Sequence, residues 1–484
     1  MNRKFATNLA FLLFLNFLVK PFYILGIDAE VQNRVGTEDY GMYFSILGFT
    51  FLFQILLDVG IVNFNTRTIS QQPFLLKKYF SKIFSLRIIL AVIYGAFVLG
   101  LGAVIGYNSS EIEMLSWLIF NQILAAFVLY IRSNLTGLLL FKYDSIVSVL
   151  DRFLLIIVCS ILLWGGISDE PFDIYWFIYA QTFAYGATAI VALFLLLSKQ
   201  PLAGLKWDTL FSLAILKKSI PYALLILLMT FYYRADSVML ERMLDDGKNQ
   251  AGIYANGFRF FEAANNIAFL FATLLLPLFS NLLQNKKSVS NLVRLSSSIL
   301  IPGAILIGVT CFFYSHELIE ARYENSTIDS GNVFGILMLC FVFISTTYIF
   351  GTLLTANGNL KKLNQIAFAG VVLNIVLNLI LIPTYKAYGA AIASLITQAL
   401  TAIAQVWLSK YSFKLKLNLS LLIRGFVFSS LIIVFGFLLR QSYFEFIPWY
   451  FSILILLFAG TIFLFSLKII EIKNIKKLFR DNPK

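Results

Sequence analysis

The chain is a succession of apolar stretches of about 20 residues, separated by short charged gaps, from Ala6 to Ile470. A helix needs about 20 apolar residues to cross the hydrocarbon core of a bilayer. Hydrophobic residues make up 59% of the 484 residues and charged residues only 13%, which is too little polar surface for a soluble protein of this size. The sequence therefore predicts an all-α integral membrane protein.

The charged gaps alternate in sign, and this alternation indicates the orientation of the chain. Loops that stay in the cytoplasm collect Lys and Arg. If both termini are cytoplasmic, the inner segments hold about 26 Lys and Arg and the outer segments about 6. The basic gaps contain Lys77, Lys78, Lys82, Lys217, Lys218, Lys286, Lys287, Lys361 and Lys362. The acidic gaps contain Asp28, Glu30, Glu38, Asp39, Glu111, Glu113, Asp169, Glu170, Asp173, Glu317, Glu320, Glu324 and Asp329.

The apolar pattern divides the chain into fourteen expected transmembrane helices. The expected spans are 6–27, 41–63, 83–106, 114–136, 146–166, 174–198, 220–241, 254–284, 296–316, 332–355, 364–384, 388–409, 422–440 and 448–470.

A basic segment after the sixth span, residues 199–219, is the expected cytoplasmic linker between two bundles of helices. The predicted domains are an N-terminal six-helix bundle (1–198), a second six-helix bundle (220–409), and two further helices with a basic cytoplasmic tail (410–484).

The second bundle begins much as the first one does. Tyr40-Gly41-Met42-Tyr43 follows the first outer loop, and Ala251-Gly252-Ile253-Tyr254 follows the outer loop after the seventh span. Six spans separate the two segments, so both bundles keep the same orientation. The pattern predicts two pseudo-symmetric bundles in a parallel repeat about an axis along the membrane normal, as in many transporters.

Composition and motifs exclude several classes of function. The net charge of +13 lies in short loops on one side of the membrane, which argues against nucleic-acid binding. The three cysteines and the single histidine have no metal-ligand spacing, and we expect no metal or cofactor. The sequence contains no Gly-x-x-x-x-Gly-Lys-Ser/Thr motif, so we expect the energy to come from an ion gradient, the membrane potential or the substrate gradient.

Ionisable residues inside the spans are the main functional signal, because a charge in the membrane normally faces a partner or a watery cavity. Lys20, Arg234 and Arg259 fall at similar depths in the outer half of three spans, which predicts one basic site. Arg87, Arg132 and Arg152 fall nearer the cytoplasm, and we expect their side chains to extend to the inner headgroups. Asp58, Asp236 and Glu262 are candidate ion or proton sites for coupling to H⁺ or Na⁺.

Polar stripes mark two otherwise apolar helices. Arg259, Glu262 and Asn266 share one face of the eighth span, and we expect this stripe to line a cavity. Asn374 and Asn378 share one face of the eleventh span, where they either line a cavity or join helices by hydrogen bonds.

Several segments, taken together, resemble a known family. These are residues 33–43 (Asn-Arg-Val-Gly-Thr-Glu-Asp-Tyr-Gly-Met-Tyr), 57–61 (Leu-Asp-Val-Gly-Ile), 234–237 (Arg-Ala-Asp-Ser), 251–255 (Ala-Gly-Ile-Tyr-Ala), 374–383 and 388–391 (Tyr-Gly-Ala-Ala). They resemble bacterial polysaccharide repeat-unit flippases, the oligosaccharide-lipid branch of the MATE-like (MOP) exporter superfamily. The resemblance implies two six-helix bundles plus two helices, and no covalent chemistry.

The resemblance also implies the substrate, a polyprenyl diphosphate that carries a short sugar chain. Lys20, Arg234 and Arg259 would hold the diphosphate, while Asn266, Asn374 and Asn378 would contact sugars. The expected partners are membrane lipids and the polysaccharide polymerase and chain-length machinery, and the expected location is the bacterial inner membrane. Three alternatives remain, namely a flippase for the peptidoglycan lipid precursor, a MATE-type multidrug exporter, and an enzyme such as a polysaccharide polymerase or ligase.

Overall fold

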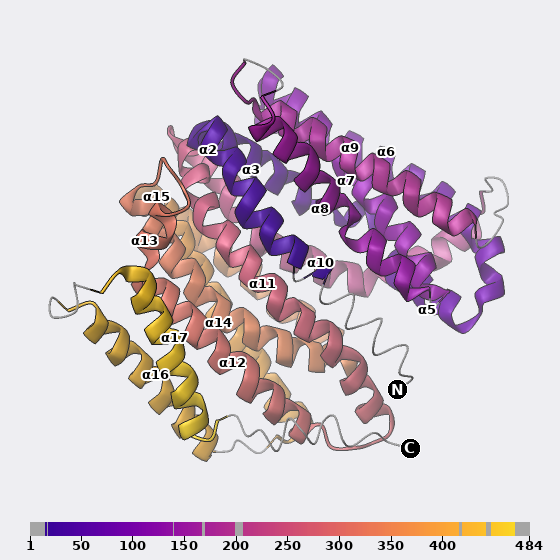
Figure 1. Ribbon diagram of the computed structural model, residues 1–484. Coiled ribbons are helices and arrows are strands. Elements are labelled where there is room, and N and C mark those ends of the chain that lie inside the picture. Colours follow the sequence, from indigo (N-terminus) through magenta and orange to yellow (C-terminus); the bar gives the residue numbers. More distant parts are fainter. Residues whose placement is uncertain are drawn as a thin grey trace. The chain divides into compact units, whose positions relative to one another are not determined.

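The computed structural model describes residues 15–16, 18–138, 140–166, 170–198, 207–415, 419–441 and 447–469, and these residues form helices joined by short turns without any β-strand. The chain groups into two compact units, Met1–Gly252 and Ile253–Lys484. Figure 1 shows the helices of the first unit in indigo to magenta and those of the second in pink to yellow. The expected all-α fold class is confirmed.

The first unit consists of long membrane helices and a few short elements near its start. Its elements are η1, a π-helix (Tyr23–Asp28), α2 (Ala29–Val35), α3 (Thr37–Leu52), α4 (Ile55–Asp58), α5 (Ile61–Gln71), η2, a 3-10 turn (Pro73–Leu75), α6 (Leu76–Ile105), α7 (Ser109–Gly137), α8 (Phe141–Trp164), α9 (Ile174–Leu197), α10 (Thr209–Met243) and the first residues of α11 (Gly247–Gln284).

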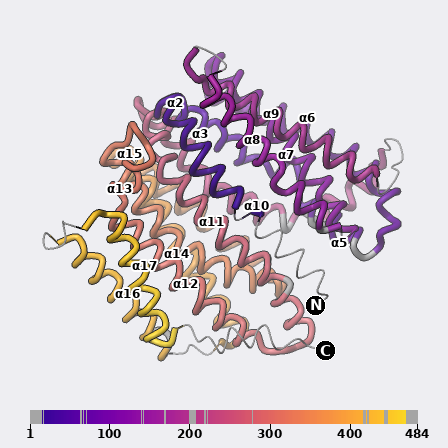
Figure 2. Tube along the Cα trace, viewed as in Figure 1, coloured from indigo at the N-terminus to yellow at the C-terminus, as the bar shows by residue number. Residues whose placement is uncertain are grey.

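The second unit contains the remainder of α11 and six further helices, which Figure 2 traces along the chain. These helices are α12 (Ser290–Phe313), α13 (Ser315–Glu320), α14 (Ile328–Ala356), α15 (Leu360–Phe413), α16 (Leu419–Leu439) and α17 (Trp449–Ser466). The helices α16 and α17 pack on each other and on α12. Leu306, Phe428 and Leu456 are buried where these three helices meet.

Ten helices in the described part of the chain are long and apolar enough to cross a membrane, and a shorter apolar helix covers Ile423–Leu439. One of the ten, α15, contains two of the expected spans, because Lys386 adopts a non-helical conformation (φ 50°, ψ −133°) three residues after Pro383. Large apolar side chains such as Phe426 and Phe458 point outward, as a lipid environment requires. The protein is therefore a multi-pass membrane protein.

The second expected span, residues 41–63, is wrong as a single helix. The structure breaks it after α3 and again at Val59 and Gly60, which both have positive φ (47° and 79°). Asp58 makes this break favourable. Its carboxylate accepts hydrogen bonds from the backbone N–H groups of Gly60 (3.1 Å) and Val62 (3.1 Å), which would otherwise be unsatisfied at the start of α5.

The expected linker is only partly covered by the structure. Residues 199–206 lie outside the described residues, as do residues 6–14 and 17 of the first span and the C-terminal tail from residue 470. The next helix, α10, begins at Thr209 instead of residue 220, with the Asp208 side chain accepting a hydrogen bond from the Phe211 N–H (3.0 Å). Asp208 also forms an ion pair with Lys82 of α6 (2.5 Å). The division into two six-helix bundles stays a prediction.

The charge pattern predicts which ends of the helices face outward. With the three native cysteines replaced by serine, single cysteines at the exposed positions Glu113 and Glu324 should react with a membrane-impermeant maleimide in intact cells. A cysteine at the exposed position Lys286 should react only after the membrane is permeabilised. Labelling of position 286 from outside would reverse the orientation.

Candidate functional site

Arg234 is one of the three cations of the predicted basic site, and it lies in the first unit. It lies on α10, where its guanidinium carbon is 4.6 Å from the centroid of the Phe51 ring of α3. An aromatic face attracts a cation and leaves its N–H groups directed around the ring edge. Asp236 is fully buried two positions further along α10. Helix geometry directs these two side chains away from each other.

Lys20 lies in the first described helical segment, and its side chain is half-buried. The π-helix η1 begins three residues later, after Pro21. Single turns of π-helix are frequent at functional sites. The structure thus places Lys20 beside a local irregularity of the first membrane helix.

Arg259 and its polar stripe lie on α11 in the second unit. The Arg259 Nη1 atom is 2.8 Å from Glu262 Oε2, and the Arg259 residue is only 6% exposed. The Asn266 Nδ2 group donates to the Glu262 backbone oxygen (3.0 Å). The stripe is therefore one connected set of contacts along a single helix. Lys20 and Arg234 belong to the first unit and Arg259 to the second, so a shared basic site stays a prediction.

Asn374 and Asn378 are fully buried on α15. The Asn378 Nδ2 group donates to Asn374 Oδ1 (3.2 Å). In the membrane such a bond satisfies polar groups that have no water nearby. The sequence left two roles open for these asparagines, lining a cavity or forming hydrogen bonds within the protein. In this conformation they form a hydrogen bond within the protein. Contact with a substrate stays a prediction and would require α15 to move.

Asp58 is held as an ion pair deep in the first unit. Arg87 Nη1 lies 3.0 Å from Asp58 Oδ1, and the Arg87 guanidinium also lies over the Tyr130 ring at 5.2 Å. The Arg87 side chain is only 3% exposed. The expectation that it reaches the headgroups was wrong, because a carboxylate within reach gives a buried guanidinium a better partner than a distant phosphate.

The other two arginines of that group are also bound inside the protein. Arg132 Nε lies 2.7 Å from Asp144 Oδ1. Arg152 donates to the Tyr185 hydroxyl (2.9 Å) and lies 4.7 Å from the centroid of the Tyr23 ring. Their partners lie on other helices, and an analysis of one span at a time therefore overlooked them.

Gly41 and Gly252, the glycines of the two repeated segments, meet in the first unit. A Cβ atom at Gly41 would overlap the Lys248 carbonyl oxygen and lie 2.6 Å from the Gly252 nitrogen. A Cβ atom at Gly252 would overlap the Thr37 carbonyl oxygen. Only two glycines allow the starts of α3 and α11 to approach so closely.

The close approach continues along one face of α3. Ser45 is fully buried one turn beyond Gly41, and a Cβ atom at Gly48 would lie 2.6 Å from the Ser237 Oγ atom of α10. Small residues at helical spacing let membrane helices pack backbone to backbone. The spacing of Gly41, Ser45 and Gly48 is visible in the sequence, so this helix contact could have been predicted from it.

Charged side chains also join helix ends near the contact of Gly41 with Gly252 in the first unit. Glu111, at the start of α7, lies 3.2 Å from Arg242 Nη2 and 3.0 Å from Lys248 Nζ. Arg242 also pairs with Glu241 (2.7 Å) and lies 3.9 Å from the centroid of the Tyr107 ring. Glu111, which belongs to one of the acidic gaps of the sequence, is only 4% exposed in the first turn of α7.

Asp28 also belongs to one of the acidic gaps of the sequence, and the structure buries its side chain. It is 1% exposed and accepts a hydrogen bond from the Tyr40 hydroxyl (2.9 Å). The Tyr43 hydroxyl accepts a hydrogen bond from Gln181 of α9 (2.7 Å).

Among the residues that the structure describes, no group of three or more His, Cys, Asp or Glu side chains could hold a metal ion.

Residues 6–283 match the family of polysaccharide biosynthesis proteins, which is more than half of the chain. The chain belongs to that family. It is also 24% identical over 384 residues to an uncharacterized membrane protein of Methanocaldococcus jannaschii, covering 75% of this chain and 88% of that protein.

Solved structures show the same fold at low sequence identity. The lipid II flippase MurJ, in an inward closed conformation, has a TM-score of 0.73 at 15% identity and covers 95% of this chain and 97% of its own. A MOP superfamily transporter from Pyrococcus furiosus has a TM-score of 0.60 at 14% identity and covers 84% and 95%. The titles of these two structures name a flippase and a transporter.

The glycine contact predicts a specific effect of one methyl group. Gly41→Ala should force α3 and α11 apart, at a cost of about 1–3 kcal/mol for overpacking. In a Ser45→Cys background without native cysteines, this separation should make position 45 reactive toward an impermeant maleimide. Gly100→Ala is the matched control, because a Cβ atom there would meet no atom within 4 Å. Equal reactivity in the two variants would contradict the role of the glycine contact.

The Asp58–Arg87 pair predicts non-additive effects on stability. Asp58→Asn should destabilise the protein by about 3–5 kcal/mol, because it leaves a buried guanidinium without its counter-charge. Adding Arg87→Met should restore most of that loss, as followed by chemical unfolding in micelles. If the stable double variant also keeps its dependence on pH and Na⁺ during transport, Asp58 is structural and not a coupling site. Additive losses would show that the two side chains act independently.

Proposed function

We propose that this protein moves polyprenyl-diphosphate-linked oligosaccharide repeat units from the cytoplasmic to the outer leaflet by alternating access. Membership of the polysaccharide biosynthesis family and the fold shared with a lipid II flippase support a lipid-linked substrate. The observation that carries the proposal is the buried Arg259, because a guanidinium inside a membrane helix binds a diphosphate in forked geometry.

Lys20 and Arg234 complete the proposed diphosphate site, and Asn266 extends it toward the sugars. Asn374 and Asn378 would join it only in a conformation that exposes them. The lipid tail can stay in hydrocarbon throughout, so only the charged and sugar parts need a protected path.

The Arg259–Glu262 pair gives a physical basis for coupling. Glu262 Oε2 occupies the hydrogen-bonding position that a phosphate oxygen would take on Arg259. Protonation of Glu262, or its pairing with Na⁺, would release the guanidinium for the substrate. Asp236, fully buried on α10, is the second candidate of this kind. Asp58 is the weaker one, since Arg87 and two backbone N–H groups already satisfy it.

The proposed location is the bacterial inner membrane with both termini cytoplasmic, and the proposed partners are the polysaccharide polymerase and chain-length machinery. The peptidoglycan lipid precursor is the second candidate substrate, because the lipid II flippase has a TM-score of 0.73 with this chain. A multidrug cation exporter is disfavoured by the predicted deep charges Lys20, Arg234 and Arg259, since a cationic drug would be repelled by them.

Liposome transport tests the proposal directly. Purified protein should make a labelled lipid-linked oligosaccharide accessible to a glycosidase added outside, and Arg259→Ala should slow this about 10- to 100-fold, because it removes hydrogen bonds to a charged group. Arg259→Lys should retain part of the rate. Arg34→Ala, at a half-exposed surface pair with Glu30, is the control and should leave the rate unchanged.

The substrate class has its own test. Cells that lack the protein should accumulate complete lipid-linked repeat units facing the cytoplasm. Parallel liposomes with lipid II distinguish the second candidate, and faster transport of lipid II than of the oligosaccharide lipid would favour it. Single repeat units accumulating on the outer leaflet of the deletion strain would show that transport does not need this protein.

A further inference from the structure

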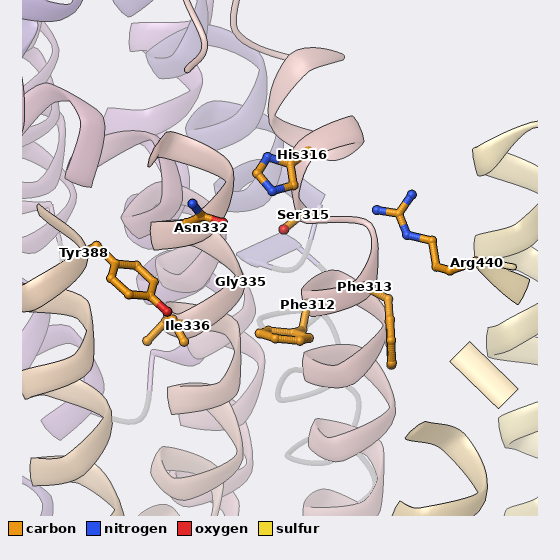
Figure 3. Close-up of a pocket in the computed structure, with 9 residues that line it drawn as sticks. All are labelled: Phe312, Phe313, Ser315, His316, Asn332, Gly335, Ile336, Tyr388 and Arg440. Carbon is orange, nitrogen blue, oxygen red and sulfur yellow. The ribbon is translucent and has the colours of Figure 1, made fainter. Parts of the chain in front are cut away.

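A cavity of about 260 Å³ lies in the second unit and is lined by residues of α12, α13, α14 and α15 and by Arg440, which directly follows the end of α16. Figure 3 shows its side chains, with His316 and Ser315 on one side and Tyr388 and Asn332 facing them. None of the residues proposed above for the diphosphate site lines it. The cavity lies at the acidic end of this unit, which the charge pattern predicts to face outward.

Two glycines of α14 make the room for this cavity. The helix α12 ends at Phe313, and α13 begins at Ser315 after a non-helical residue. A Cβ atom at Gly331 would overlap the imidazole of His316, so only glycine lets the imidazole lie against α14. One turn later, a Cβ atom at Gly335 would lie 3.3 Å from the Phe312 ring, and its absence deepens the cavity floor.

A kink in α15 supplies the facing wall. Lys386 interrupts the helix with φ 50° and ψ −133°, and Tyr388 follows two residues later. In Figure 3 the Tyr388 hydroxyl points toward Ile336, into the space between the helices. Tyr388 belongs to one of the segments singled out in the sequence, and the proposed transport site does not use it.

Four polar side chains of the cavity can both donate and accept hydrogen bonds. In the part of the chain that the structure describes, no hydrogen bond occupies the side chains of Ser315, His316, Asn332 or Tyr388. A hydroxyl, a neutral imidazole and an amide each offer a donor and an acceptor. Sugar hydroxyls have the same dual character, whereas a phosphate oxygen only accepts.

Arg440, the one charged side chain among the described residues that line the cavity, already has a counter-charge. Arg440 forms a two-point ion pair with Glu317 of α13, the second contact being 3.2 Å, and lies over the Tyr314 ring at 5.1 Å. A paired guanidinium offers little net attraction to a free anion. Beside it, the 43% exposed Phe312 ring presents an apolar face of the kind against which the C–H face of a sugar ring packs.

We propose that this cavity binds one neutral sugar ring of the lipid-linked oligosaccharide, separately from the diphosphate site. This inference rests on the proposed function for the identity of the substrate. Drug-sized ligands occupy pockets of roughly 300–1,000 Å³, so about 260 Å³ suits a single ring. Ser315, His316, Asn332 and Tyr388 contact its hydroxyls, and Phe312 covers its apolar face.

Free monosaccharides test the inference on the full-length protein in nanodiscs. Glucose, galactose, rhamnose and N-acetylglucosamine serve as probes, and saturation-transfer NMR measures binding. At least one probe should bind, and Tyr388→Phe should weaken that binding about fivefold because one hydrogen bond is lost. Asn332→Leu should weaken it further. Tyr385→Phe is the matched control, since Tyr385 is exposed on the same helix and does not line the cavity.

Different outcomes separate this inference from the proposed function. If no probe binds, if Tyr388→Phe and Tyr385→Phe bind equally, or if inorganic phosphate competes with the sugar, the cavity is not a sugar site. Wild-type transport of the oligosaccharide lipid in liposomes would then still support the proposed function. Cavity-dependent sugar binding without such transport would instead keep this inference and reject the proposed function.

Discussion

Hydrocarbon offers polar groups no hydrogen-bond partner, so every charge inside this protein must be satisfied by the chain itself. This requirement accounts for the partners of three arginines, of which Arg87 is buried and Arg132 and Arg152 are half-buried. Arg87 binds Asp58, Arg132 binds Asp144, and Arg152 binds Tyr185. Each of these contacts joins side chains from different helices. The ion pairs thus fix which helices are neighbours within the first unit, in addition to stabilising them.

The same absence of water makes small residues important. Apolar side chains gain little by leaving lipid for protein, so membrane helices associate through close backbone contact. Gly41 and Gly252 allow α3 and α11 to meet at their starts, and the ion pairs of Glu111 hold the same end of the unit. This contact tolerates no added atoms, because one extra methyl group already exceeds the space. The starts of α3 and α11 are therefore suited to two discrete states, in contact or separated.

The proposed transport chemistry uses other charges, and one of them, Arg259, has its partner on the same helix. The ion pair of Arg259 with Glu262 is local, being three residues apart on α11, and it can open without disturbing the packing of other helices. The Asp58–Arg87 pair is different, since its carboxylate also holds the first N–H groups of α5. Opening that pair would unravel a helix start. A local pair suits exchange with a substrate, and an anchored pair suits stability.

The sequence by itself determined the membrane character, the all-α fold class and most of the helix positions, because apolar length and loop charge are local properties. It also identified the family and placed Arg259 and Glu262 on one face of a helix, which follows from helical periodicity. Only the tertiary structure decided that Arg87 and Glu111 are buried, that Gly41 meets Gly252, and that His316 and Tyr388 share a cavity. Those outcomes depend on which helices lie side by side, and side-chain periodicity along one helix carries no information about the neighbour that a given face will meet.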